Sequence, residues 1–195
     1  MKIKNRLSNL KLTGRRIILR PLKFSDTLAI YSNLQDQKIA EQMRLIPQPF
    51  KLSDAKDFIR ESKKFLRAKK ALTWGIELKA QKKIVGCVSL YDLDQRNEIE
   101  HEIDYWLGEK YRGQGLLVET LDLVFNFAFK KLKIHRIWAE VFGDNFTSQK
   151  ILKKLGFKKE GYHREAYWHA SRWRDSVHYG LLSQEFLRSK KKIFY

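Results

Sequence analysis

The acidic side chains of residues 98–107 are the first group whose types and spacing suit chemistry. The stretch alternates as a β-strand does, which places Glu98, Glu100, Glu102 and Asp104 on one face and mostly apolar residues on the other. Crowded carboxylates repel one another, so the pKa of one of them rises, and together they attract a cation. A carboxylate with a raised pKa can accept a proton near neutral pH. A solvated acidic strand face is the alternative interpretation.

A glycine-bearing loop, residues 108–115, follows this strand and opens a long predicted helix. The backbone N–H groups at a helix start bind phosphate, and the helix dipole strengthens that binding. Gly113 and Gly115 lack a Cβ, so a ligand can approach the backbone closely. Lys110 and Arg112 add positive charge beside the loop. The alternative is a plain strand–helix turn that uses glycine for its dihedral angles.

Two other phosphate motifs do not fit this loop. The nucleotide P-loop requires Gly-x-x-x-x-Gly-Lys-Ser/Thr, which the sequence lacks. The dinucleotide fingerprint requires a third glycine where Val118 stands. Neither ATP nor NAD is therefore favoured as the ligand.

The surrounding elements predict a mixed α/β domain. Strand-like patterns occupy residues 16–20, 72–78, 84–90, 98–107 and 134–141, with further pieces across 157–182. Helices are expected to be capped at Ser25 and Ser53, to follow the glycine loop as far as Leu132, and to run from Asn145 to Leu155 with Gly156 as the stop. Strands, then alternating strands and helices, then strands again are typical of one domain that combines both kinds of element.

Four ordered blocks of the sequence resemble the GNAT N-acetyltransferases. Residues 110–115, Lys-Tyr-Arg-Gly-Gln-Gly, are similar to the pyrophosphate loop of that family, with lysine where glutamine or arginine is usual. Residues 145–161 carry the asparagine, serine, Leu-Gly-Phe and Glu-Gly of the branch typified by ribosomal-protein N-terminal acetyltransferases. Residues 102–107 and 16–22 also resemble that branch. The similarity extends from about residue 12 to residue 182.

The resemblance implies the acyl-CoA N-acyltransferase fold: a mostly antiparallel twisted sheet with flanking helices, in which two parallel strands, here residues 98–107 and 134–141, splay apart around the cofactor. It implies acetyl-CoA as the acyl donor. The five histidines have no metal-ligand spacing and there is one cysteine, so we expect no metal. The cofactor-binding residues carried over are Trp106, Leu107, Lys110, Arg112, Gly113, Gln114, Gly115, Leu116, Leu117, Asn145 and Ser148.

The same resemblance implies roles around the acceptor amine. Glu102 is the first choice for the general base, and Asp104 is the second. Glu100 and Asp104 are expected to bind the acceptor. The tyrosine that many members use to protonate the leaving thiolate is replaced by Leu152, so Ser148 is expected to donate a hydrogen bond to that thiolate instead.

Composition and charge limit the compartment and the partners. Of 195 residues, Cys87 is the single cysteine, which fits a reducing compartment, and no stretch has the length of a membrane span. We therefore expect a cytoplasmic protein that forms one domain over residues 1–195, with a basic tail at 188–195, as a monomer or homodimer. The formal charge of +18 favours anionic partners.

The leading functional prediction is acetylation of a primary amine, with an acidic or ribosome-associated protein N-terminus as the best candidate acceptor. An amino sugar on a nucleotide and an antibiotic remain alternatives on the same scaffold. Two other functional classes also remain. One is a basic nucleic-acid-binding module, although the sequence has no nucleic-acid-binding motif and would support non-specific contact alone. The other is a sensor that binds acyl-CoA without turnover.

Overall fold

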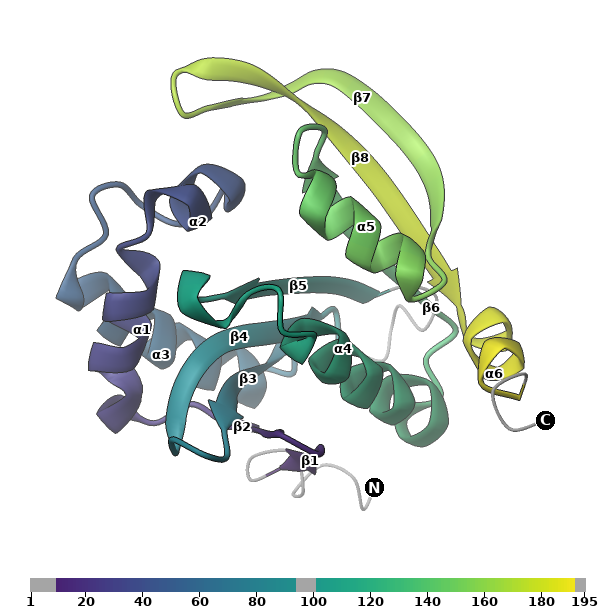
Figure 1. Cartoon of the computed structure of the whole chain (residues 1–195), viewed down its shortest axis with the longest axis horizontal. Coiled ribbons are helices and arrows are strands. Elements are labelled where there is room, and N and C mark those ends of the chain that lie inside the picture. Colours follow the sequence, from purple (N-terminus) through teal and green to yellow (C-terminus); the bar gives the residue numbers. More distant parts are fainter. Residues whose placement is uncertain (1–9, 94–100, 192–195) are drawn as a thin grey trace.

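The computed structural model describes residues 10–93 and 101–191, and it contains an eight-stranded sheet in the order β1-β2-β3-β4-β5-β6-β8-β7 (Figure 1). All neighbouring strands are antiparallel except the pair β5 and β6. The strands are β1 (Leu12–Thr13), β2 (Ile17–Pro21), β3 (Ala71–Leu78), β4 (Lys83–Tyr91), β5 (His101–Leu107), β6 (Arg136–Phe142), β7 (Lys158–His169) and β8 (Arg172–Leu182).

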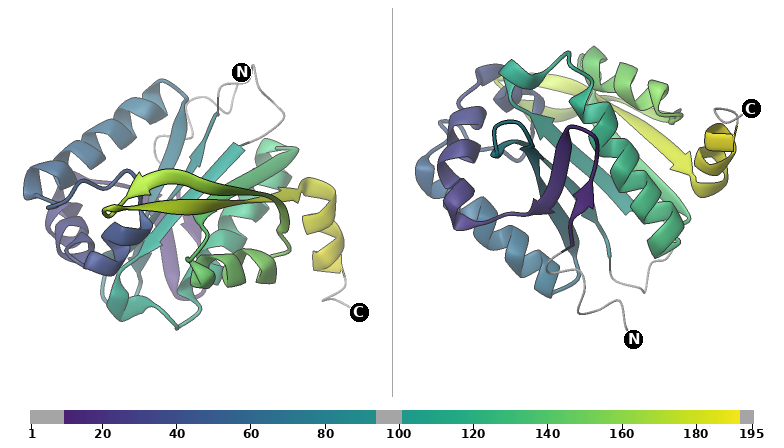
Figure 2. Two further views of the ribbon diagram at one scale, coloured as in Figure 1. Left: turned by 90° about the horizontal axis from the view of Figure 1, so that it is seen from above. Right: turned by 60° about the horizontal axis from the view of Figure 1, so that its bottom comes forward.

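Helices cover both faces of this sheet. They are α1 (Thr27–Leu34), α2 (Gln37–Gln42), α3 (Leu52–Arg67), α4 (Leu116–Phe127), α5 (Phe146–Lys154) and α6 (Ser183–Lys191). Buried residues of α1 and α3 form one apolar cluster with Cys87 and Trp106, while α4 and α5 contribute to a larger cluster with β2 to β6 and β8. Figure 2 shows α4 crossing the face opposite α1 and α3. A ligand that contacts both faces of the sheet must therefore cross it between two strands.

The parallel strands β5 and β6 provide that passage. Within the described residues, they pair at His101 with Ile137 and at Glu102 with Trp138, and nowhere else. From Ile103 onward β5 is paired with β4 alone among the described strands, so its other edge has no ladder partner. The N–H of Tyr105 donates to Asp104 and the carbonyl of Leu107 accepts from Arg112, and the remaining backbone groups along that edge are open to a ligand.

The two last strands form a long hairpin that arches over the sheet toward α2 (Figure 1). Its register shifts between Lys159 and Gly161 and again between His163 and Tyr167, and such bulges bend a strand. The bend brings the hairpin to the end of α2, where His169 Nε2 lies 3.1 Å from the carbonyl oxygen of Ala40.

The predicted fold class, the splayed parallel pair and most elements are confirmed, but two helix starts are wrong. Neither Ser25 nor Ser53 caps a helix, because an acidic side chain reaches back to the backbone instead. Asp26 accepts from the N–H of Lys23 at 2.8 Å, and Asp54 accepts from the N–H of Lys51 at 2.7 Å. An ionised acceptor makes the stronger bond to a backbone donor.

Three other differences concern elements at the margins of the prediction. The short helix α2 was not predicted. Residues 188–191, expected as tail, belong to α6. The first residues of the predicted strand 98–107, including Glu98 and Glu100, lie outside the described residues. Among the residues that are described, no helix has the length and apolar character needed to cross a membrane.

Candidate active site

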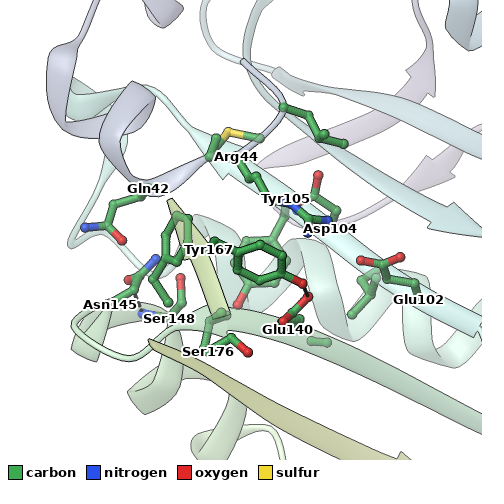
Figure 3. Close-up of a pocket in the computed structure, with 16 residues that line it drawn as sticks. Gln42, Arg44, Glu102, Asp104, Tyr105, Glu140, Asn145, Ser148, Tyr167 and Ser176 are labelled. Atoms are coloured by element: carbon green, nitrogen blue, oxygen red, sulfur yellow. Dashed lines mark hydrogen bonds between the residues drawn. The ribbon is translucent and has the colours of Figure 1, made fainter. Parts of the chain in front are cut away.

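A pocket opens where β5 and β6 part (Figure 3). Its walls come from both faces of the sheet, from the segment after α2, from the start of α5 and from the β7–β8 hairpin. The lining residues are Gln42, Met43, Arg44, Leu45, Glu102, Ile103, Asp104, Tyr105, Ala139, Glu140, Val141, Phe142, Asn145, Ser148, Tyr167 and Ser176. The site thus joins segments that lie far apart in the sequence.

Two of the predicted acidic residues, Glu102 and Asp104, line this pocket. Burial raises the pKa of Glu102 to about 7, and the charges of Asp104, Asp92 and Glu140 add to the rise. Burial also raises the pKa of Asp104, against the opposing hydrogen bond from the N–H of Tyr105. A carboxylate that titrates near neutral pH suits a general base. The predicted acceptor-binding residue Glu100 lies outside the described residues.

A third carboxylate, Glu140 of β6, completes the acidic wall. Its Oε2 accepts a hydrogen bond of 2.9 Å from the hydroxyl of Tyr167, and its Oε1 lies 3.2 Å from Nε2 of His178. The guanidinium of Arg44 stacks over the Tyr167 ring at 4.2 Å from its centroid. The sequence reasoning missed Glu140 and Arg44, since only the fold brings these two residues to β5.

The start of α5 supplies the other predicted polar residues. Asn145 caps the helix, because its side-chain oxygen accepts from the N–H of Ser148 at 3.1 Å, and both residues line the pocket. The Tyr105 hydroxyl is buried and forms no well-aligned hydrogen bond with any described group. Burial raises the pKa of Tyr105, and the nearby Ser148 hydroxyl acts in the opposite direction. This unsatisfied hydroxyl was also missed, because strand alternation placed Tyr105 on the face opposite the acidic residues.

The glycine loop lies at the start of α4 as predicted. Gly113 and Gly115 both have φ of +73°, and a Cβ added at Gly113 would meet no atom within 4 Å. No side chain caps the helix at Gly115, so its first N–H groups are free of a capping partner. Arg16 stands beside the loop: its Nη1 donates to the carbonyl of Gln114 at 2.8 Å, and its Nε donates to Glu119 at 2.9 Å.

The remaining predicted cofactor residues differ in what their side chains can reach. Trp106 is only 5% exposed and packs in the cluster with α1 and α3, so only its backbone can face a ligand. Leu116 is buried in the larger core. Arg112 pairs with Asp36 at 2.9 Å and donates to the carbonyl of Leu107 at 3.0 Å.

The other loop positions stay close to the surface. Lys110 is exposed, and its carbonyl accepts a 2.9 Å bond from the Gln114 side chain. Leu117 is partly buried against the core. The described residues contain no cluster of three or more histidine, cysteine or acidic side chains placed to hold a metal ion.

Comparison with known proteins identifies the architecture. A family model described as an acetyltransferase (GNAT) domain matches residues 16–158. The chain belongs to the GNAT acetyltransferase family. This confirms the resemblance inferred from the loop and the Asn145 block, and it makes the chain an N-acetyltransferase, in a family whose acyl donor is acetyl-CoA.

Individual relatives of this acetyltransferase are distant. An uncharacterized N-acetyltransferase of Bacillus subtilis, YnaD, is 25% identical over 176 residues, which cover 90% of this chain and 98% of the relative. The [ribosomal protein uS5]-alanine N-acetyltransferase of Escherichia coli is 28% identical over 106 residues, which cover 54% of this chain and 55% of the relative. Among solved structures, the ribosomal L7/L12 alpha-N-protein acetyltransferase RimL in complex with coenzyme A has a TM-score of 0.81 at 17% identity, covering 89% of this chain and 98% of that one.

Proposed function

We propose that this acetyltransferase acts on a primary amine, and that its acceptor is the N-terminal amino group of a protein such as a ribosomal protein. The observation that carries the proposal is the acidic pocket at the parting of β5 and β6, with Glu102 poised to titrate near neutral pH. A cationic amine is attracted there and can lose its proton there.

The glycine loop fits the diphosphate of the acyl donor. The N–H groups of residues 113–117 offer hydrogen bonds, whereas that of Arg112 already donates to the carbonyl of Glu109 at 3.1 Å. The absence of a Cβ at Gly113 leaves room for close approach. Arg16, beside the loop, adds a cation whose position is fixed by Glu119. Bound acetyl-CoA supplies the activated acetyl thioester, and the free edge of β5 near Leu107 offers backbone donors to its arm and its carbonyl oxygen.

Glu102 takes the proton of the acceptor ammonium in this proposal. A primary ammonium has a pKa near ~8 at a protein N-terminus and near ~10 on a lysine side chain. A carboxylate with a pKa of about 7 is well matched to the N-terminal amine. Asp104 and Glu140 keep the pocket negative while the ammonium enters.

Ser148 and Tyr105 serve the leaving thiolate. A thiol has a pKa near ~8.5, far below that of an alkyl hydroxyl, so Ser148 stabilises the thiolate by donating a hydrogen bond rather than by losing its proton. The buried hydroxyl of Tyr105 provides a second donor close to Ser148. Asn145, which caps the same helix, is placed to bond the donor's arm.

The choice of a protein N-terminus rests on charge and on the relatives. The overall charge of +18 attracts an anionic acceptor molecule, while the local pocket is acidic and selects its amine. A free polyamine is a cation, so the overall charge of the chain repels it. The names of two relatives, one for uS5 alanine and one for the L7/L12 N-terminus, agree with a ribosomal acceptor.

Two measurements in sequence test this proposal. A thermal-shift titration with acetyl-CoA and CoA, with ATP as the control, should raise Tm by several degrees for the two CoA compounds only, since a ligand at about 100 times its Kd adds about 2.7 kcal/mol. Mass spectrometry should then detect one added acetyl group on peptides with ribosomal-protein N-termini.

The acceptor panel separates the alternatives. N-terminally blocked peptides should stay unmodified if the α-amine is the acceptor. Faster acetylation of nucleotide-linked amino sugars or aminoglycosides than of any peptide would reject the protein acceptor. Cofactor binding without acetyl transfer to any amine would favour an acyl-CoA sensor. RNA binding without a CoA-induced shift in Tm would favour a nucleic-acid-binding module.

A further inference from the structure

Arg174 of β8 is a buried cation whose contacts the catalytic proposal does not use. It is only 3% exposed, and its guanidinium lies 3.9 Å from the centroid of the Phe142 ring. Its Nη1 donates to the backbone carbonyl of Glu41, and its Nη2 donates to Asp144. A buried charge is costly unless it is paired, so these contacts hold its position firmly.

The partners of Arg174 belong to two segments that line the candidate pocket, and one of them, Oε1 of the lining residue Gln42, lies 3.4 Å from Nη2. Glu41 belongs to the end of α2, and the next residues, 42–45, line one wall. Asp144 ends the turn after β6, and Asn145, the next residue, also lines the pocket. One guanidinium therefore ties together two segments that are more than 100 residues apart in sequence.

Apolar packing and the β7–β8 hairpin both hold the end of α2. The helix has six residues, of which Ile39 and Ala40 are buried. Its last carbonyls carry the negative end of the helix dipole, which cationic or N–H donors stabilise. Arg174 binds the carbonyl of Glu41, and His169 lies 3.1 Å from that of Ala40, so the hairpin caps this end of the helix.

The contact with Arg174 also changes the pKa of Asp144. Its burial alone would raise its pKa, but the hydrogen bond and charge of Arg174, together with Arg172, hold the pKa of Asp144 below its ordinary value. The carboxylate is thus ionised and shared between a buried arginine and an exposed one, since the Arg172 side chain is 61% exposed and 2.6 Å away. Arg172 provides a natural comparison because it binds the same carboxylate.

We propose that Arg174 is a positioning residue that sets the width of the acceptor pocket by joining the end of α2 to the start of α5. The inference rests on the proposed function, because it takes this pocket as the place where the amine binds. Lysine cannot replace arginine here, since one ammonium lacks the planar fork that reaches two acceptors in different directions.

The test compares Arg174→Lys with the matched variant Arg172→Lys. Arg174→Lys should raise KM for the acceptor amine about 10- to 100-fold, the range expected when a charge-assisted hydrogen bond is lost. The Kd for acetyl-CoA should change less than about twofold in both variants, and Arg172→Lys should leave the acceptor KM unchanged. An unchanged acceptor KM in Arg174→Lys would overturn the proposal.

Hydrogen exchange supplies a readout that needs no acceptor. The Met43 amide, which bonds the carbonyl of Ala40 at 3.3 Å, should exchange about tenfold faster in Arg174→Lys, whereas amides of β3 and β4 should keep their protection. Faster exchange throughout the sheet, with weaker acetyl-CoA binding, would assign Arg174 a merely structural role. If Arg174→Lys does not fold, Asp144→Asn loosens the same guanidinium and should shift the acceptor KM and the Met43 amide in the same directions.

This pair of readouts separates the two proposals. If no amine is acetylated by the wild-type chain, the proposed acceptor chemistry fails, and the Met43 amide still reports whether Arg174 holds α2. If acetylation proceeds but the amide does not respond, the positioning role alone is rejected.

Discussion

At the residue scale, the three carboxylates of the acidic pocket differ in their hydrogen-bond partners and therefore in their roles. Glu102, Asp104 and Glu140 line one cavity, yet Glu140 already accepts a hydrogen bond from Tyr167, and Asp104 accepts one from the backbone of Tyr105. Glu102 has no hydrogen-bond partner of this kind among the residues that the structure describes, and burial is the main cause of its raised pKa of about 7. It is therefore the carboxylate best suited to exchange a proton with an incoming ammonium.

Replacing Glu102 by glutamine tests this role. Glu102→Gln should lower kcat about 100- to 10,000-fold, the usual contribution of a general base, and leave the Kd for acetyl-CoA unchanged. In the wild type, kcat/KM should rise with pH through about 7 as Glu102 ionises, and this limb should disappear in the variant. Glu61→Gln on the exposed surface of α3 is the control. Wild-type turnover in Glu102→Gln would remove this residue from the mechanism.

The same carboxyl predicts a dependence of stability on pH. The pKa of Glu102 is raised from 4.5 to about 7, so between these pH values the folded chain holds a proton that the unfolded chain has lost. The free energy of unfolding contributed by this group therefore falls as pH rises through that window and stays low above it. Glu102→Gln should raise Tm relative to the wild type more at pH 8 than at pH 4.5. An equal difference at both pH values would contradict the raised pKa.

Ser148 gives a sharper test of the thiolate end. Its backbone N–H bonds Asn145, so Ser148→Ala removes the hydroxyl and keeps the helix cap. The variant should lose roughly 10- to 1000-fold in kcat, as for a lost oxyanion donor, with acetyl-CoA affinity preserved. Thr147→Ala, one position earlier on the exposed side of α5, should have wild-type rates. Full activity in Ser148→Ala would reduce Ser148 to a helix residue.

At the element scale, glycines at the start of α4 and at the end of α5 allow the effect of backbone strain to be distinguished from the effect on ligand binding. Gly113 has φ of +73° with open space at its Cβ, and Gly156, at the end of α5, has φ of +92° with its nearest atom at 3.7 Å. Alanine at either site should lower the free energy of unfolding by about 1–2 kcal/mol, the cost of a left-handed conformation. Only Gly113→Ala should also weaken CoA binding, with a Kd about 10- to 100-fold higher, because the methyl group of the new alanine meets the diphosphate. Equal CoA affinity in both variants would move the diphosphate elsewhere.

Elements with strong local signals were predictable, and those fixed by distant contacts were not. The helix after the glycine loop has an apolar stripe of helical period and was predicted to Leu132, where α4 does continue as a π-helical turn. The six residues of α2 are too few to display a period, and the hairpin holds them in place through Arg174 and His169. The caps at Ser25 and Ser53 were wrong because the sequence offers serine and aspartate side by side, and only the backbone path selects between them.

The site was predictable to the same extent. Motif spacing located Glu102, Asp104, Asn145 and Ser148, and the structure brings all four to one pocket. Glu140 and Tyr167 come from strands whose order in the sheet cannot be read from local pattern, because β8 lies between β6 and β7. The burial of Trp106 away from the gap likewise depends on the packing of α1 and α3.

At the scale of the whole molecule, a net charge of +18 contrasts with a pocket that holds three carboxylates. The charge of +18 acts over distances of about 10 Å at 0.1 M salt, whereas the carboxylates of the pocket act only on a group that has already entered. The long-range field therefore collects anions, including a phosphorylated acyl donor, and the local field selects the amine. An acceptor molecule that carries an amine and is otherwise anionic is attracted both by the overall positive charge and by the carboxylates of the pocket.

The long-range field predicts how salt changes acetyl-CoA binding. Raising ionic strength from about 0.02 M to 0.5 M should lower the association rate constant about tenfold or more, because screening shortens the reach of the basic surface. The dissociation rate constant should change less, since the bonds from the N–H groups at the start of α4 act at contact distance. Stopped-flow measurements with acetyl-CoA give both constants, and acetyl-pantetheine, which lacks phosphates, is the control whose association should not depend on salt. A salt-independent association rate for acetyl-CoA would mean that the +18 charge serves another anionic partner, and RNA binding with a steep salt dependence would then be the measurement to make.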